Sequence, residues 1–178
     1  MEEPRITKTE EVGDGRWMSI RRAWWISGEH TGMREWSHSK MRAACAVPRT
    51  RDGRWVLTRE WRAPLGTWCV QFPGGMVDDG EDPMDAAARE CWEETGHRVV
   101  SIESDGLQPM ALSPGFSDEL VWFFHCTVED EPDGGKPCLD EPMTVHAVAP
   151  DDLMDFLRDA RGRGEYVCSW LLLATTAL

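Results

Sequence analysis

Three glutamates, Glu90, Glu93 and Glu94, stand close together near the middle of the chain. A helix predicted for residues 83–95 would place them on one side, because residues three and four apart are neighbours on a helix surface. Like charges at these spacings destabilise a bare helix, so the pattern favours a bound cation. Mg²⁺ takes carboxylate oxygens as ligands and leaves its other positions to water and substrate phosphates. The alternative is an acidic face that is only solvated.

The residues around this cluster follow a longer pattern. From Gly75 to His97 the chain reads Gly, five residues, Glu81, seven residues, and then RECWEETGH. This pattern resembles the Nudix box, G-x5-E-x7-R-E-U-x-E-E-x-G-U, in which U is a bulky apolar residue. Cys91 and His97 stand at two U positions and are the departures from it. Neither departure removes a chemical group that the box needs.

The resemblance implies a hydrolase of a nucleoside diphosphate linked to another moiety. In such enzymes Mg²⁺ or Mn²⁺ orients the pyrophosphate, neutralises its charge and lowers the pKa of a bound water. The implied metal ligands are the backbone carbonyl of Gly75 and the carboxylates of Glu90, Glu93 and Glu94. These three glutamates are also the implied catalytic residues. Three further box residues are implied to be structural, Glu81, Arg89 and Gly96. Of these, Arg89 would orient the neighbouring glutamates by bidentate pairing.

Three segments outside the core of the box resemble the ADP-ribose and ADP-sugar pyrophosphatase branch of that family. They are residues 59–66 (REWRAPLG), 78–83 (DDGEDP) and 113–119 (SPGFSDE). The resemblance implies hydrolysis of the pyrophosphate bond of ADP-ribose or a related ADP-sugar, which yields AMP and a sugar phosphate. It also implies a homodimer whose N-terminal strands are exchanged between the subunits.

The same resemblance implies five substrate-binding residues, Trp17, Trp36, Arg62, Pro114 and Gly115. The two indoles would stack on the adenine, an interaction worth about 1–3 kcal/mol per ring. The guanidinium would pair with two diphosphate oxygens. Each assignment has an alternative, because the two tryptophans can pack on a strand face or in a dimer core. Arg62 can instead form a surface ion pair with Glu60.

The general base in this branch often comes from an acidic loop before the last strand. Here Asp140 and Glu141 stand just before a strand predicted at residues 143–148. We therefore predict Glu141 as the base, with Asp140 as the second choice. Glu119 is expected either to hold a metal-bound water, as a further metal ligand, or to serve as the base instead. An acidic loop that is only solvated is the alternative.

One short pattern points away from this branch. Its members commonly have Pro-Ala-Gly where this chain has Pro73-Gly74-Gly75. Hydrolysis of another nucleotide therefore stays open, with GDP-mannose or another nucleotide sugar, a dinucleoside polyphosphate or a modified nucleoside triphosphate as the substrate. A non-catalytic module that senses ADP-ribose is a further alternative, although such modules tend to lose box carboxylates that this chain keeps.

The elements that must position these residues can be predicted from local patterns. Asp82 is a good N-cap, Pro83 suits the first helical position and Gly96 ends the helix, so a helix is predicted at 83–95. Its core-facing stripe is predicted to be Met84, Ala88, Cys91, Trp92 and Thr95. Strands are predicted at residues 17–26, 34–38, 43–47, 55–61, 69–72, 97–103, 107–112, 120–128 and 143–148. Two closing helices are predicted at 151–161 and 166–177.

These elements predict an α+β fold, namely a Nudix-type α/β/α sandwich with a mixed β-sheet. Residues 1–42 are expected to form an antiparallel strand region that builds the dimer. Residues 43–178 are expected to form the hydrolase domain, with the box at residues 75–97.

Composition limits the partners and the compartment. The chain has 32 Asp and Glu against 19 Lys and Arg, a net charge of −13. Such a surface repels phosphate backbones, so we expect a small nucleotide sugar as the partner rather than RNA or DNA. The 6 cysteines show no C-x-x-C pair, which favours reduced thiols over a zinc site. No signal-peptide core or membrane-length apolar run is found, so we expect a soluble cytoplasmic protein.

Overall fold

The structure is a computed structural model that describes residues 2–104, 106, 108–135 and 142–176. The chain divides into two compact units. The first unit consists of Met1–Arg42 together with Pro109–Val121, and the second consists of Ala43–Gln108 together with Trp122–Leu178. The segment 109–121, which the sequence division had assigned to the hydrolase domain, thus groups with the N-terminal strands.

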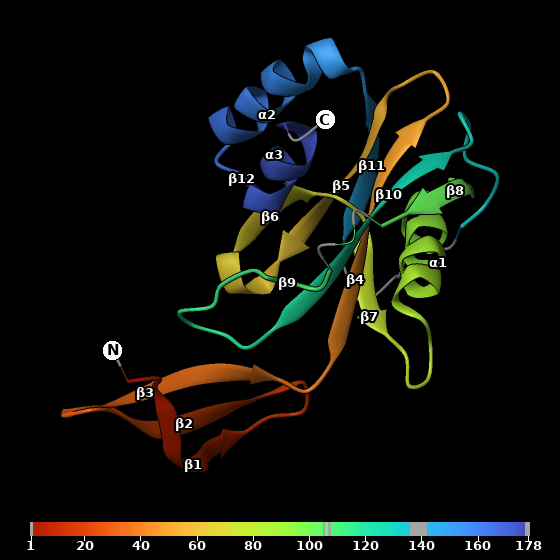
Figure 1. Ribbon diagram of the computed structural model, residues 1–178. Coiled ribbons are helices and arrows are strands. Elements are labelled where there is room, and N and C mark those ends of the chain that lie inside the picture. The colour runs from red at the N-terminus through yellow and green to blue at the C-terminus, as the bar shows by residue number, and fades with distance from the viewer. Residues whose placement is uncertain (1, 105, 107, 136–141, 177–178) are drawn as a thin grey trace. The chain divides into compact units, whose positions relative to one another are not determined.

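The first unit is built on an antiparallel sheet with the strand order β1-β2-β3 (Figure 1). Its strands are β1 (Arg5–Asp14), β2 (Met18–Ser27) and β3 (His30–Ser39). The segment 109–121 joins β3 through a parallel bridge between Ser37 and Ser117. An antiparallel N-terminal region was predicted, and this sheet confirms it.

The first strand was missed by the sequence analysis. β1 is almost wholly polar and exposed, so it shows neither apolar alternation nor an apolar run. Its pairing with β2 is supported by ion pairs across the strands, from Arg22 to Glu10 at 3.0 Å and from Arg21 to Glu11 at 3.9 Å. Cross-strand charge pairs of this kind stabilise a sheet without any hydrophobic signal in the sequence.

The second unit is centred on a larger mixed sheet with the order β12-β6-β5-β4-β10-β8, to which β11 adds at β5, β7 at β4 and β9 at β10. The strands of this sheet are β4 (Arg42–Thr50), β5 (Trp55–Arg62), β6 (Thr67–Gln71), β7 (Gly74–Val77), β8 (Val99–Glu103), β9 (Met110–Ala111), β10 (Leu120–Val128), β11 (Met143–Val148) and β12 (Tyr166–Val167). β9 and the first two residues of β10 belong to the segment 109–121 that groups with the first unit. The sheet is mixed because β12 runs parallel to β6, whereas β5 and β6 are antiparallel.

Helices cover both faces of this sheet (Figure 1). α1 (Pro83–Thr95) lies on one side, and α2 (Leu153–Gly162) and α3 (Ser169–Thr176) lie on the other. A short 3₁₀ turn at Ala63–Leu65 follows β5, and another at Pro150–Asp152 precedes α2. The arrangement confirms the predicted α+β sandwich with a mixed sheet.

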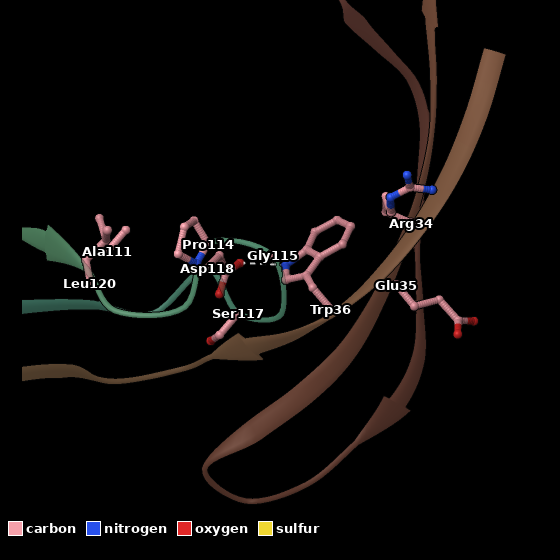
Figure 2. A pocket seen from close by; sticks show the side chains of 9 residues that line it. All are labelled: Arg34, Glu35, Trp36, Ala111, Pro114, Gly115, Ser117, Asp118 and Leu120. Atoms are coloured by element: carbon pink, nitrogen blue, oxygen red, sulfur yellow. Dashed lines mark hydrogen bonds between the residues drawn. The ribbon is translucent and has the colours of Figure 1, made fainter. Parts of the chain in front are cut away.

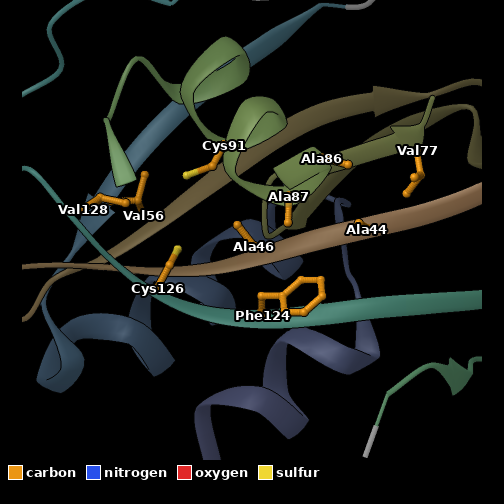
Figure 3. Packing of buried hydrophobic residues seen from close by; sticks show 10 residues of the cluster. All are labelled: Ala44, Ala46, Val56, Val77, Ala86, Ala87, Cys91, Phe124, Cys126 and Val128. Atoms are coloured by element: carbon orange, nitrogen blue, oxygen red, sulfur yellow. The ribbon is translucent and has the colours of Figure 1, made fainter. Parts of the chain in front are cut away.

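The core beneath α1 confirms Cys91 and Thr95 of the predicted stripe of this helix, but the stripe as a whole was predicted at the wrong orientation. Small residues of the helix, Ala86 and Ala87, pack with Cys91 against β4 and β10, as Figure 3 shows. The buried stripe is Ala86, Ala87, Cys91, Glu94 and Thr95, so the helix is rotated from the predicted orientation. Alanines let a helix approach a sheet closely, whereas the larger Trp92 stays half-buried at the edge and donates to Asp133. As a result Glu94 is turned into the protein.

The predicted bounds of α1 are confirmed, and the caps explain them. Asp82 accepts a hydrogen bond from the backbone N–H of Met84 at 2.8 Å, and Pro83 occupies the first turn. Gly96 follows with φ +76°, and a Cβ there would lie 2.4 Å from the carbonyl oxygen of Gly134. Glycine is therefore required at the end of this helix.

Elsewhere the structure corrects two predicted elements and adds a strand that was not predicted. The helix predicted at 166–177 begins only at Ser169, because residues 166–167 pair with β6 as a strand. The strand predicted at 107–112 is reduced to residues 110–111, and β7 was not predicted at all.

Two expectations from composition can be compared with the described residues. Five cysteines are free thiols, Cys45, Cys69, Cys91, Cys126 and Cys168, as expected; Cys138 lies outside the described residues. Within the described part of the chain, no helix is long and apolar enough to cross a membrane.

Candidate active site

Arg89, from the middle of α1, joins three carboxylates of the box. Its Nε and Nη2 donate to the two carboxylate oxygens of Glu81, each at 2.9 Å. Its Nη1 donates to Glu90 at 2.8 Å and to Glu93 at 3.2 Å. Nη2 also donates to the carbonyl of Met76 at 3.0 Å. One guanidinium therefore holds both the loop before the helix and two carboxylates on it, by the bidentate geometry that arginine favours.

The charges of this cluster do not balance within it. Hydrogen bonds from Arg89, and one from the backbone N–H of Asp78, lower the pKa of Glu81 to about 2. The same contacts raise the pKa of Arg89 above its ordinary value, so this pair stays ionised. Glu90 and Glu93 share the remaining hydrogen bonds of that single guanidinium. The cluster keeps an excess of negative charge, which favours a cation.

Glu94 differs from its neighbours because it is buried. It is 9% exposed, and its carboxylate accepts a hydrogen bond from the backbone N–H of Gly74 at 3.0 Å. Burial, and then the nearby charge of Glu60, raise the pKa of Glu94 to about 9. A buried carboxylate with so little compensation calls for a proton or a cation.

Glycine at position 75 is required by the approach of Glu90. A Cβ built on Gly75 would lie 2.5 Å from the Glu90 carboxylate, closer than any side chain permits. The backbone of the loop therefore lies directly against a predicted ligand. Burial also raises the pKa of Glu90, although its hydrogen bond from Arg89 acts in the opposite direction. The box thus brings Gly75 and Glu90 together on one side of the helix.

The donors of this region suit a hard divalent cation, since the three helix carboxylates and the Gly75 carbonyl offer only oxygen. Among the described residues, no group of three or more acidic, histidine or cysteine side chains already stands in metal-binding positions. The reason is visible in the contacts, because Arg89 draws Glu90 and Glu93 to itself while Glu94 is held at Gly74. Metal binding would require these carboxylates to turn, and the metal site stays a prediction.

A second polar group lies on β5, on the side of the sheet that faces α1. Arg62 pairs with Glu60 at 2.7 Å, and its Nε donates to Gln71 at 3.2 Å. The Glu60 side chain is only 3% exposed, so the pair is not the surface ion pair considered as the alternative. Glu60 and Gln71 were not singled out from the sequence as site residues. Their signal is that both are polar and buried on strands that also bury several apolar side chains.

The first unit contains a hollow of about 610 Å³ next to Trp36. It is lined by Arg34, Glu35, Trp36, Ala111, Pro114, Gly115, Ser117, Asp118 and Leu120, as Figure 2 shows. Three predicted substrate-binding residues, Trp36, Pro114 and Gly115, are therefore brought together. The volume falls in the range of about 300–1,000 Å³ that is typical of small-molecule pockets. We call it the Trp36 hollow.

Asp118 fixes the geometry of the Trp36 hollow and was not predicted. Its Oδ2 accepts from Trp36 Nε1 at 2.9 Å and contacts His38 Nδ1 at 2.7 Å, while its Oδ1 accepts from the backbone N–H of Ser39 at 3.1 Å. Partial burial raises the pKa of Asp118, but these hydrogen bonds outweigh it and hold that pKa below its ordinary value. The interaction joins residues about 80 positions apart, which no local pattern reveals.

The remaining predicted residues are placed as follows. Trp17 is 50% exposed and stacks with Arg16 at 4.3 Å, and it does not line the Trp36 hollow. Glu119 is half-buried in the first unit, where its backbone N–H donates to Ser117 Oγ at 3.1 Å. Glu141 and Asp140 lie outside the described residues.

The departure at Gly74 has a packing explanation. A Cβ at this position would lie 2.6 Å from the carbonyl oxygen of Ala44 and 2.6 Å from Cys45 Sγ. Alanine therefore cannot occupy position 74 without a shift of the backbone of β4. The Pro-Gly-Gly sequence reflects the close pairing of β7 with β4, and it does not by itself indicate another substrate.

The NUDIX domain family matches residues 39–170. The chain is similar to the ADP-sugar pyrophosphatase of Mus musculus, with 28% identity over 180 residues that cover 91% of this chain and 80% of that protein. It is also similar to the ADP-ribose pyrophosphatase of Bacillus subtilis (strain 168), with 33% identity over 82 residues, or 46% of this chain and 43% of that protein. A crystal structure described as an ADP compounds hydrolase has a TM-score of 0.66 at 21% identity and covers 87% of this chain and 84% of that one.

The family match spans well over half of the chain and includes the whole box. The structural likeness, at low identity, supports the fold independently of the sequence. Both agree with the sandwich of α1, the mixed sheet and the C-terminal helices described above. The chain belongs to the Nudix hydrolase family and is similar to its ADP-ribose and ADP-sugar pyrophosphatases.

Proposed function

We propose that the protein hydrolyses the pyrophosphate bond of ADP-ribose or a related ADP-sugar, giving AMP and a sugar phosphate, with Mg²⁺ or Mn²⁺. The observation that carries the reaction type is the group of box carboxylates, three of which surround Arg89 with more negative charge than one guanidinium balances. The substrate class is supported by similarity over 91% of the chain to an ADP-sugar pyrophosphatase.

A divalent ion held by the box would neutralise the charge of the pyrophosphate and lower the pKa of the attacking water. The residues of the chain do the rest. Glu90, Glu93 and Glu94, with the carbonyl of Gly75, would hold the ion. Arg89 keeps its bidentate bond to Glu81 and so holds the helix carboxylates near the loop.

Two kinds of contact with the substrate are proposed. Arg62 pairs with the diphosphate oxygens, because its guanidinium is fixed on one side and is still 35% exposed. Trp36 stacks on the base within the Trp36 hollow, where Pro114 and Gly115 form the facing wall. Trp17, exposed on the same unit, is proposed as a second stacking ring.

The general base is proposed as it was predicted, with Glu141 first and Asp140 second. Glu119 is retained as a holder of metal-bound water or as the alternative base. A carboxylate suits the task because it can take the proton of a water already acidified by the ion. Each of the three residues can be replaced by its amide to separate these assignments. We expect the replacement of the general base to change the pH dependence of turnover.

A homodimer with exchanged N-terminal strands is also proposed. The first unit leaves several large apolar side chains exposed on or next to its strands, namely Ile6, Val12, Trp17, Met18, Ile20 and Met33. A second copy of the strands would bury such side chains. The free thiols agree with a reducing compartment, and we place the protein in the cytoplasm.

The function is tested by incubating the protein with Mg²⁺ and a panel of ADP-ribose, ADP-glucose, GDP-mannose, NADH, diadenosine polyphosphates and 8-oxo-dGTP. Products are separated by ion-exchange chromatography. Fastest release of AMP from ADP-ribose or ADP-glucose supports the proposal. Cleavage of another member alone would leave the box chemistry standing and refute the substrate, and binding of ADP-ribose without any turnover would indicate a sensor.

A further inference from the structure

The polar group on β5 and β6 is a built structure within an otherwise apolar sheet. It consists of Thr58, Glu60, Arg62 and Gln71, which we call the β5 network. Residues at alternate positions of a strand share one face, so Thr58, Glu60 and Arg62 stand in a row. β5 and β6 are antiparallel with Thr58 opposite Gln71, which brings Gln71 onto the same face. The residues at these positions are buried or half-buried.

The contacts form a closed chain of donors and acceptors. Glu60 accepts from Thr58 Oγ1 at 2.7 Å and from Gln71 Nε2 at 3.1 Å through Oε1, and its Oε2 pairs with Arg62 Nη2 at 2.7 Å. The amide oxygen of Gln71 then accepts from Arg62 Nε at 3.2 Å. Two separate side chains thus hold the Nε and Nη2 groups of one guanidinium.

We propose that Glu60 and Gln71 are positioning residues that hold the Arg62 guanidinium in place to engage the diphosphate of the substrate. This inference rests on the proposed function only for the role of Arg62 as a diphosphate ligand. It does not depend on which base or sugar the substrate carries. Neither positioning residue touches substrate in this proposal, since both act through Arg62.

Burial explains why the arrangement is rigid. A buried carboxylate that loses its partner costs far more than an exposed one, so Arg62 cannot leave Glu60 without leaving a charge unpaired. The inner edge of the guanidinium is therefore fixed, while about a third of the side chain remains exposed. A planar group fixed along one edge loses little further freedom when its other edge pairs with a phosphate.

The same strand provides a matched control on its opposite face. Arg59 pairs with Glu165 at 2.7 Å, and the Glu165 side chain is 3% exposed, as is that of Glu60. Arg163 also pairs with Glu165 at 2.9 Å. Glu165→Gln therefore removes a buried carboxylate from an arginine of β5 without touching the box side of the sheet. Its effect measures the structural cost alone.

The decisive variants are Glu60→Gln, Gln71→Glu and the double exchange Glu60→Gln/Gln71→Glu. In the double variant the carboxylate stands at position 71, where it can accept the hydrogen bond from Arg62 Nε. The amide at position 60 can still accept from Thr58 Oγ1. Net charge and hydrogen-bonding capacity are both retained. A merely structural role would not require this exchange to restore substrate affinity.

We expect Glu60→Gln to raise KM for ADP-ribose by about 10- to 100-fold with a much smaller change in kcat, because a displaced guanidinium loses binding to the diphosphate. The double variant should recover most of the loss. Glu165→Gln should lower the melting temperature as Glu60→Gln does and leave KM unchanged. An unchanged or lower KM in Glu60→Gln would overturn the proposal, because Glu60 would then only mask the Arg62 charge.

A second measurement separates this inference from the choice of substrate. Inorganic pyrophosphate is titrated into each variant with Mg²⁺ present and its binding is followed by calorimetry. Weaker binding in Glu60→Gln, restored in the double variant, supports the positioning role even if ADP-ribose is not the substrate. Equal pyrophosphate binding in all variants overturns it. If the unmodified protein hydrolyses ADP-ribose while Arg62→Ala is unaffected, the inference fails and the proposed function stands.

Discussion

The box and the Trp36 hollow differ in the contacts that stabilise each of them. In the box, Arg89 contacts carboxylates on its own helix and on the loop that precedes it, all within a short stretch of sequence. In the hollow, Asp118 reaches across about 80 positions of the chain to Trp36 and His38. The box is charged and partly buried, whereas the hollow is lined mostly by apolar surface and one indole. The box is thus built from contacts that are local in the sequence, whereas the hollow depends on tertiary pairing.

The largest expected effect breaks the box. Glu94→Gln should reduce turnover by more than about 100-fold, because several kcal/mol of charge stabilisation depends on the ion that the carboxylates hold. The variant should remain folded, since a neutral amide can still accept the Gly74 N–H and is less costly to bury. Turnover and circular dichroism are the measurements. Glu103→Gln, at an exposed carboxylate outside the box, is the control and should have no effect.

A smaller effect is expected in the hollow. Trp36→Ala should raise KM by about 5- to 150-fold with kcat little changed, which corresponds to the loss of one stacking ring at about 1–3 kcal/mol. Trp36→Phe keeps a ring and loses only the hydrogen bond to Asp118, so its KM should lie between those of the unmodified protein and Trp36→Ala. Steady-state kinetics on the best panel substrate is the measurement. A drop in kcat with constant KM would contradict a role in base binding.

A still smaller effect should follow from removing the contacts that hold the loop at residues 113–118, which lines the Trp36 hollow. Asp118→Ala removes three hydrogen bonds and should raise amide hydrogen exchange in residues 113–118, with a rise in KM of about 3- to 10-fold. Hydrogen exchange followed by mass spectrometry tests the first expectation. Unchanged exchange in this segment would mean that the backbone bonds between Ser37 and the loop suffice.

The smallest effect concerns acid stability of the box. The pKa of Glu81 is about 2 in the folded protein and 4.5 when unperturbed. Its stabilisation is therefore complete above the unperturbed value and is lost as the pH falls toward the folded value. Glu81→Gln should remove this part of the pH dependence, so its melting temperature should fall less steeply on acidification. Parallel curves for the variant and the unmodified protein would refute the role of the Arg89 pair.

The sequence predicted what depends on local signals. Asp82, Pro83 and Gly96 fixed the ends of α1 because each acts on its own helix terminus. The rotation of that helix could not be predicted, since the close packing of Ala86 and Ala87 on the sheet, and not the larger apolar residues, decides which side is buried. The burial of Glu94 follows from that rotation.

Other features escaped because they depend on partners far along the chain. In the sequence, Asp118 is one of several acidic loop residues. Its role becomes evident only from its hydrogen bonds to β3 in the structure. Glu60 and Gln71 become a pair only once β5 and β6 are in register. β1 carries no apolar period, because ion pairs with β2 replace hydrophobic packing in its register.

The two buried arginine–glutamate pairs of β5 also bear on how the chain avoids misfolding. Successive side chains of a strand point to opposite faces, so a slip of one residue would move Arg62 and Glu60 to the side of α2 and α3, and Arg59 to the side of α1. Arg59 would then lose Glu165, whereas Glu60 and Arg62, which move together, would lose their hydrogen bonds with Gln71, at a cost of several kcal/mol. β5 therefore carries on both faces a penalty against incorrect strand alignment, which an entirely apolar strand in this position would lack.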